Sequence, residues 1–97
     1  MSRKAMNAKE RKKVNSLLYE VTRGWFRHIP LDSIFWALEQ HGLKPVQEDG
    51  TPWAGFLCGA EGKTDIALQK DEKIIQEALH LRWYRHGMYY EITAYVN

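Results

Sequence analysis

Cysteine is nearly absent from this chain, since Cys58 is the only one among its 97 residues. A single cysteine cannot form an internal disulfide, so packing and hydrogen bonds alone must stabilise the fold. No apolar run approaches the roughly 20 residues of a membrane-spanning helix, and no secretory signal pattern opens the sequence. These absences favour a protein of a reducing compartment, and we expect it to be cytoplasmic.

A strong charge of either sign is also lacking. The 14 Lys and Arg residues are offset by 12 Asp and Glu, which leaves a formal net charge of +2. Such a weak bias neither requires nor excludes a polyanionic partner. With 44% hydrophobic and 27% charged residues, the chain has the composition of a folded globular protein. We expect one domain over residues 1–97, with a flexible tail over residues 1–6.

A nucleotide-binding motif is present only in part. The stretch GAEGKT ends in Gly62-Lys63-Thr64, as a P-loop does. A complete P-loop needs an earlier glycine to open the phosphate nest and a helix after the threonine. Leu57 stands where that glycine belongs, and residues 65–69 alternate as a strand does. We therefore predict a hairpin turn over residues 60–63, with Gly62 at positive φ, and no nucleotide cofactor.

The first half of the chain predicts two helices. Asn7 with Glu10 three positions later is typical of a capping box. Gly24 weakens a helix by about 1 kcal/mol relative to alanine, so the first helix ends or bends there. Pro30 marks a boundary, and a second helix should end at Gly42. The expected inward residues are Val14, Leu17, Leu18, Val21, Trp25 and Ile29 in the first helix, and Leu31, Ile34, Phe35 and Leu38 in the second.

The second half of the chain has the patterns of strands. Residues 43–52 hold two prolines and an Asp-Gly pair, which suits a loop or a short edge strand. Residues 53–59 and 64–69 then predict a first hairpin, and the polar run 70–73 links it to the final segment of the chain. We expect an α+β fold in which two N-terminal helices pack on one face of an antiparallel sheet of about four strands.

The final segment, ALHLRWYRHGMYYEITAYVN, predicts a second hairpin with its turn at His86 and Gly87. A helix over residues 71–85 is the competing interpretation, supported by apolar spacing, and the sequence leaves residues 74–85 open between strand and helix. For the hairpin, the predicted pairs are Trp83–Tyr90, Leu81–Ile92 and Leu79–Ala94 on the inner face, and Tyr84–Tyr89, Arg82–Glu91 and His80–Thr93 on the outer face.

Residues for catalysis or metal binding are not assembled in the sequence. Cys58 has no basic neighbour in sequence and is predicted to be a small buried thiol. His80 and His86 would lie about 20 Å apart along a strand, too far to share one ion. The acids are scattered over loops and helix surfaces. We therefore predict no catalytic residue, no metal, no cofactor and no enzymatic activity.

The outer face of the second hairpin is the first candidate surface. Tyrosine and arginine are enriched at protein interfaces, and a small core cannot bury so many aromatic rings. A solvated sheet face stabilised by its own cross-strand pairs explains the same pattern equally well. Our main hypothesis is a small protein-binding module, an inhibitor or adaptor of the kind that phages and other mobile elements encode. The predicted protein-binding residues are His80, Arg82, Tyr84, His86, Tyr89, Glu91, Tyr95 and Trp36.

The basic side of the first helix is the second candidate surface. It lies opposite the apolar stripe, is interrupted by Glu20 alone, and could follow the phosphates of a nucleic acid. An ordinary solvated helix face would have the same pattern. The partner is expected to be another protein, with nucleic acid as the alternative, a homodimer left open and no membrane. The predicted nucleic-acid-binding residues are Lys9, Lys12, Lys13, Arg23 and Arg27.

Overall fold

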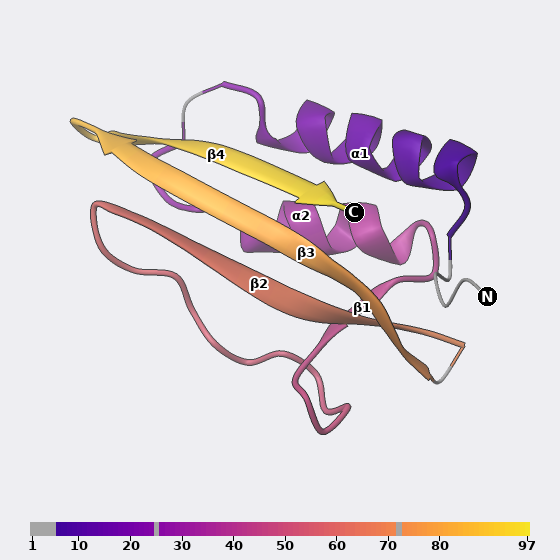
Figure 1. Ribbon diagram of the computed structural model, residues 1–97. Coiled ribbons are helices and arrows are strands. Elements are labelled where there is room, and N and C mark those ends of the chain that lie inside the picture. The colour runs from indigo at the N-terminus through magenta and orange to yellow at the C-terminus, as the bar shows by residue number, and fades with distance from the viewer. Residues whose placement is uncertain (1–5, 25, 72) are drawn as a thin grey trace.

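The computed structural model describes residues 6–24, 26–71 and 73–97, with residues 73–77 described by their backbone alone. Over these residues the chain forms two helices followed by a four-stranded antiparallel sheet, which confirms the predicted α+β class (Figure 1). The elements are α1 (Ala8–Thr22), α2 (Leu31–Glu39), β1 (Lys44–Val46), β2 (Glu61–Lys70), β3 (Lys73–His86) and β4 (Tyr89–Val96).

Helix α1 begins where the sequence predicts and ends just before Gly24, so the prediction that Ile29 belongs to this helix is wrong. The side chain of Asn7 accepts a hydrogen bond from the backbone N–H of Glu10 at 2.8 Å, which satisfies one donor that the first turn leaves open. The helix ends at Thr22 because Gly24 takes a left-handed φ of +100°. Of the predicted stripe, Val14 and Leu18 are buried, Leu17, Val21 and Ile29 pack partly buried against the core, and Trp25 lies outside the described residues.

Helix α2 ends in a Schellman arrangement at the predicted glycine. Gly42 has a φ of +72°, its N–H donates to the Glu39 carbonyl, and the N–H of Leu43 donates to the Leu38 carbonyl at 3.0 Å. Trp36 lies off the inward face and is 52% exposed. The inward residues are Ile34, Ala37 and Leu38, which are buried, and Leu31 and Phe35, which are partly buried.

The sheet has the order β1-β2-β3-β4, and the predicted first hairpin is wrong. Residues 53–59 form no strand, and β2 instead pairs with β3 through a turn at Asp71, whose φ is +52°. Aspartate tolerates this left-handed conformation, so the polar run forms the tight connection. The short edge strand expected within residues 43–52 is present as β1. Because β3 is a strand, the competing helix over residues 71–85 is excluded.

Gly62 is in the sheet rather than in a turn, so the predicted turn over residues 60–63 is wrong. Gly62 lies within β2 directly opposite Trp83 of β3, and Gly59, with a φ of +95°, turns the chain before the strand. A Cβ atom on Gly62 would lie under 3.0 Å from three atoms of the Trp83 indole. Glycine is therefore required here by the close packing of a ring and not by backbone conformation.

The second hairpin forms, but its turn lies one residue later than predicted. Gly87, with a φ of +62°, occupies the first position of a two-residue turn, so Trp83 pairs with Ile92 instead of Tyr90. Every predicted pair is wrong by two residues, yet both predicted faces are correct because side chains alternate with a period of two. The observed pairs are Leu79–Val96, Leu81–Ala94 and Trp83–Ile92 on the inner face, and His80–Tyr95, Arg82–Thr93, Tyr84–Glu91 and His86–Tyr89 on the outer face.

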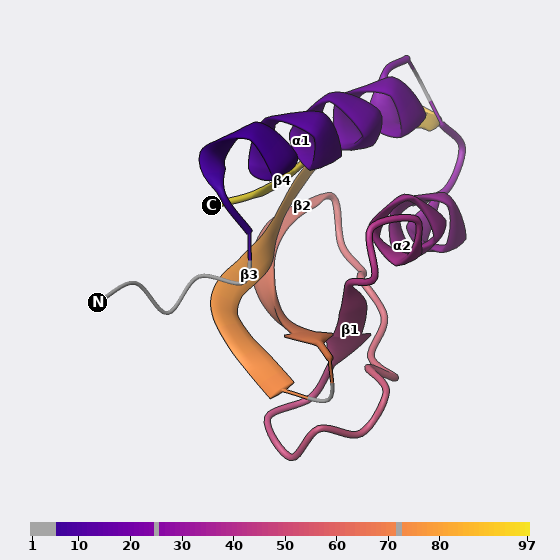
Figure 2. The same ribbon diagram turned by 90° about the vertical axis from the view of Figure 1, so that its right-hand side faces the viewer.

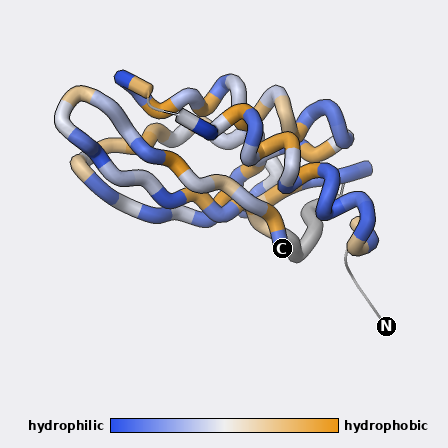
Figure 3. Tube along the Cα trace, turned by 90° about the horizontal axis from the view of Figure 1, so that it is seen from above, coloured by the Kyte–Doolittle hydropathy of each residue, from blue (hydrophilic) through white to orange (hydrophobic). Residues whose placement is uncertain are grey.

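Both helices lie on one side of the sheet, and the core fills the space between these layers (Figure 2). Along the strands in Figure 3, hydrophobic and hydrophilic positions interchange, as expected when only one sheet face is covered. The fully buried side chains of the strands are therefore those that point toward the helices. The largest fully buried side chains are Val14, Leu18, Ile34, Leu38, Leu43, Val46, Ile66, Leu68, Leu79, Leu81 and Val96.

The exposed edge of β4 is closed at both ends. The Asn15 side chain of α1 donates to the Val96 carbonyl at 2.8 Å and accepts from the Val96 N–H at 2.7 Å, as a neighbouring strand would. Near the other end, Phe26 and Tyr90 exchange both of their backbone hydrogen bonds. These contacts occupy backbone groups that would otherwise attract another strand.

The contact between Gly62 and Trp83 predicts an inverted effect of alanine. At a position without a left-handed φ, Gly→Ala ordinarily stabilises a protein by about 0.4–1 kcal/mol. We expect Gly62→Ala to destabilise this protein by about 1–3 kcal/mol instead, because the new methyl group meets the indole. In a Trp83→Leu background the same substitution should be neutral or stabilising. Urea unfolding of the four proteins measures this difference, and equal effects in both backgrounds would contradict it.

The amide of Asn15 gives a second prediction. Asn15→Ala removes both hydrogen bonds to Val96 and should destabilise the protein by about 1–3 kcal/mol. Asn15→Asp keeps the shape but places a carboxylate beside the Val96 carbonyl, so it should destabilise the protein at neutral pH. Relative to the unmodified protein, it should recover part of this loss near about pH 3, where the carboxyl group is protonated and can donate. Denaturant unfolding with Ser16→Ala as the control tests this, and Asn15→Asp as stable as that control would contradict it.

Candidate functional site

The outer sheet face brings together the residues that the sequence assigned to it. We use this name for the side chains of β2, β3 and β4 that point away from the helices. Tyr84, Tyr89 and Tyr95 are 41%, 40% and 45% exposed on this face. In register, the side chains form four rows across the strands: His86 and Tyr89; Glu61, Tyr84 and Glu91; Lys63, Arg82 and Thr93; and Asp65, His80 and Tyr95.

The row at Asp65, His80 and Tyr95 is ordered by its own contacts. Asp65 Oδ1 lies 2.7 Å from His80 Nδ1, and the amide nitrogen of Asn97 lies 2.9 Å from His80 Nε2. An amide nitrogen can only donate, so Nε2 accepts and Nδ1 carries the proton that is donated to Asp65. The His80 ring also stacks on Tyr95 with centroids 4.8 Å apart. This row is an Asp–His pair whose other nitrogen is occupied by an amide and not by a nucleophile.

Two further contacts orient the remaining outer rows. The Arg82 guanidinium lies 5.7 Å from the centre of the Tyr84 ring, a cation–π distance. Glu91 Oε1 lies 3.6 Å from His86 Nε2. Tyr84 therefore has a neighbour on the same face, as Tyr95 has in His80, and both rings keep much of their area exposed.

Trp36 does not join this surface. It projects from α2, in the helical layer on the opposite side of the sheet, although it is 52% exposed (Figure 2). The structure therefore separates Trp36 from the other predicted protein-binding residues.

The basic side of α1 is shorter than the sequence predicted. Lys9, Lys12 and Lys13 are exposed on the helix, but Arg23 and Arg27 lie beyond its end at Thr22. Gly24 redirects the chain there, so the predicted continuous stripe is wrong for both arginines.

An ion pair joins β2 to α1, the helix that carries Lys9, Lys12 and Lys13. Glu10 Oε1 lies 2.8 Å from Lys70 Nζ of β2. The hydrogen bond from Lys70 holds the pKa of Glu10 below its ordinary value, and partial desolvation opposes this shift. The carboxylate therefore stays charged, and the Lys70 ammonium balances its charge.

Cys58 and the partial P-loop motif offer no assembled chemistry. Cys58 is exposed, so the predicted buried thiol is wrong, because residues 53–59 form an irregular segment outside the sheet. Gly62, Lys63 and Thr64 lie within β2, paired with β3, and strand continues after them as expected. Their backbone therefore serves the sheet, without the helix that a phosphate nest requires. Across the described part of the chain, no three His, Cys, Asp or Glu side chains gather as metal ligands.

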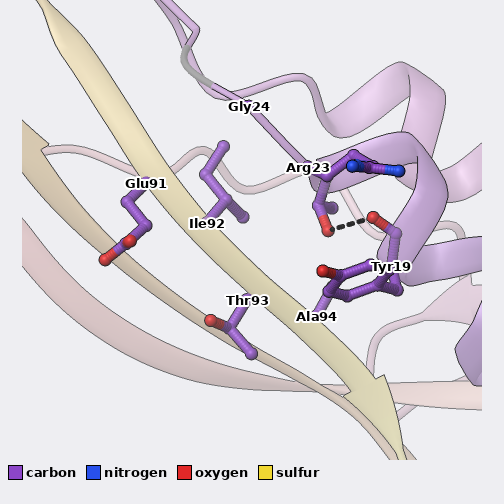
Figure 4. A pocket seen from close by; sticks show the side chains of 8 residues that line it. Tyr19, Arg23, Gly24, Glu91, Ile92, Thr93 and Ala94 are labelled. Carbon is purple, nitrogen blue, oxygen red and sulfur yellow. Dashed lines mark hydrogen bonds between the residues drawn. The ribbon is translucent and has the colours of Figure 1, made fainter.

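A hollow that the sequence did not reveal lies between the end of α1 and β4 (Figure 4). Tyr90 and Val96 direct their backbone N–H and C=O groups to the open edge of β4. Successive residues of a strand alternate between its two edges, so the N–H and C=O groups of Ile92 and Ala94 point to the same open edge. The lining side chains include no histidine, cysteine or pair of carboxylates, and the hollow offers groups for hydrogen bonding. It is lined by Tyr19, Thr22, Arg23, Gly24, Glu91, Ile92, Thr93 and Ala94.

Comparison with known proteins gives no family for this chain. No family model matches it, and neither a curated protein nor a solved structure matches it. Within the residues that the structure describes, no helix has the length and apolar character needed to cross a membrane. Functional reasoning therefore depends on the surfaces described above.

The opposite faces of the second hairpin predict unequal effects on stability. Trp83 is 5% exposed, so Trp83→Ala should destabilise the protein by about 3–5 kcal/mol through lost burial and a cavity. Tyr84→Ser with Tyr89→Ser should cost far less, on the order of 1 kcal/mol, because both rings are exposed and lose only surface contacts. Guanidinium unfolding measures both values. If the tyrosine pair proved as costly as Trp83, the outer face would be part of the core.

Proposed function

We propose that this protein is a non-enzymatic protein-binding module that binds its partner through the outer sheet face. The observation that carries the proposal is the exposure of Tyr84, Tyr89 and Tyr95, at 40–45%, on a sheet face that neither helix covers. Tyrosine and arginine are enriched where alanine scanning finds most of the binding energy of protein interfaces. A face with three exposed tyrosines and Arg82 has that composition.

The order of these rings supports binding as well. Tyr95 stacks on His80, and Tyr84 lies beside the Arg82 guanidinium at 5.7 Å. Rings that are already held by neighbours lose little conformational entropy when a partner covers them. More of the contact energy is then available for affinity.

The biological setting forms part of the same proposal. An inhibitor or adaptor of the kind that phages and other mobile elements encode would use a small domain with one binding face and no catalytic site. The exposed free thiol of Cys58 is suited to a reducing cytoplasm. The nucleic-acid alternative is less favoured, because Arg23 and Arg27 lie beyond the end of α1 and the predicted basic stripe is shortened to its lysines.

Capture of partners from the native host tests this function. The protein with Tyr84→Ser and Tyr89→Ser should lose the bound protein, while Tyr19→Ser should keep it. Tyr19 is a matched control, because it is 64% exposed but lies on α1. Equal capture by both variants would refute binding through the outer sheet face.

A nuclease-treated sample distinguishes the alternative. Binding through nucleic acid would disappear with nuclease, would weaken steeply with added salt, and would fall when Lys9, Lys12 and Lys13 are replaced by glutamine. The proposed protein interface predicts capture that survives nuclease and tolerates the three lysine substitutions.

A further inference from the structure

We infer that the outer sheet face receives a segment of the partner protein that carries a carboxylate, and that this carboxylate binds between Lys63 and Arg82. This inference rests on the proposed protein-binding function and adds the chemistry of the partner. It is carried by the third row of the face, where Lys63 of β2, Arg82 of β3 and Thr93 of β4 lie side by side in register.

Lys63 and Arg82 form a cross-strand pair of like charge. Like charges directly opposite each other destabilise a sheet, and sheets usually place an opposite charge at such a position. Among the described residues, neither of these two side chains forms an ion pair within 4.0 Å. The sheet thus holds two adjacent positive charges that a carboxylate from outside would neutralise together.

Two of the three acids in the adjacent rows have a histidine as their neighbour. Asp65 contacts His80 at 2.7 Å in the row on one side, and Glu91 contacts His86 at 3.6 Å from the row on the other side. Neither of these carboxylates forms an ion pair with Lys63 or Arg82. The like-charged pair therefore stays available, although acids lie nearby in sequence.

The surface is hollowed at the basic row. A depression lined by Lys63, His80, Arg82, Thr93 and Tyr95, among others, lies over it. The guanidinium of Arg82 can bind a carboxylate through two parallel N–H groups, Lys63 can add a point charge, and the Thr93 hydroxyl can donate a further hydrogen bond. Partly exposed tyrosine rings flank the row on both sides and can exclude water from the contact.

The same face disfavours a nucleic acid. Three carboxylates, those of Glu61, Asp65 and Glu91, occupy the rows beside the basic pair. A nucleic-acid backbone carries a charge at every nucleotide and would meet these acids repeatedly. A single carboxylate of a protein segment can bind between them without such repulsion.

The test uses a short peptide with one central glutamate flanked by tyrosines, with its glutamine counterpart as the control ligand, followed by NMR titration of the labelled protein. We expect the amide shifts to concentrate at Lys63, Arg82 and Thr93, and the glutamate peptide to bind about fivefold more tightly than the glutamine peptide. Lys63→Gln with Arg82→Gln should abolish this preference. Lys12→Gln with Lys13→Gln, on α1, should retain it, and so should Arg82→Lys.

The melting temperature of a Lys63 variant distinguishes a binding role of this residue from a structural role. Because Lys63→Gln removes a like-charge contact, its melting temperature should be unchanged or raised while its preference for the glutamate peptide is lost. A clear fall in melting temperature would mean that Lys63 stabilises the sheet, and it would overturn the inference. Equal binding of the two peptides would overturn it too.

Other occupants of the face have distinct signatures, and each would overturn the inference. Displacement of the peptide by oligothymidylate at equal charge would indicate a nucleic acid. Concentration-dependent self-association that Lys63→Gln abolishes would indicate a second copy of the chain. If the captured host partner is lost with Tyr84→Ser and Tyr89→Ser but kept with Lys63→Gln and Arg82→Gln, the proposed function stands and the carboxylate-bearing segment is refuted.

Discussion

The packing of the Trp83 indole on Gly62 is the contact on which the rest of this structure depends. It joins β2 to β3 at one register, because only a residue without a side chain fits beneath the ring. A slip of one residue would place Trp83 on the solvent side and the tyrosines toward the helices. The contact therefore determines which side chains share the outer sheet face, and it brings Lys63 of β2 opposite Arg82 of β3.

The helices cover only one face of the sheet, so the inner face contributes to the core and the outer face is exposed to solvent. The inner side chains of β3 and β4, together with α1 and α2, supply the buried core. The outer side chains contribute cross-strand contacts worth a fraction of that stability, so their identity is less constrained by folding. Because the exposed tyrosines contribute little to the stability of the fold, a binding function on this face would cost the protein little stability.

Much of this fold could be predicted from local patterns, and the failures have physical causes. The cap at Asn7, the stop at Gly42 and the two faces of the second hairpin depend on neighbours in sequence, and all were predicted correctly. The first hairpin and the turn at Gly62 were predicted wrongly, because a glycine near polar residues is typical of a turn. Glycine is needed at position 62 because the Trp83 ring, 21 residues away in sequence, packs against it. The row of Lys63 and Arg82 was missed for the same reason, since it exists only once β2 pairs with β3.

The treatment of the sheet edges explains why a partner should use the face. At β1, Pro45 lacks a donor, its carbonyl accepts from the Trp53 N–H, and the chain that returns at Pro52 covers the strand. At β4, Asn15 and Phe26 occupy the backbone groups of Val96 and Tyr90 at the two ends of the open edge, which leaves a short stretch at Ile92 and Ala94 between them. Addition of a partner strand is therefore hindered at both edges. This hindrance at the edges supports our proposal that a partner protein is recognised by side chains of the outer sheet face, where the tyrosines and the Lys63–Arg82 pair lie.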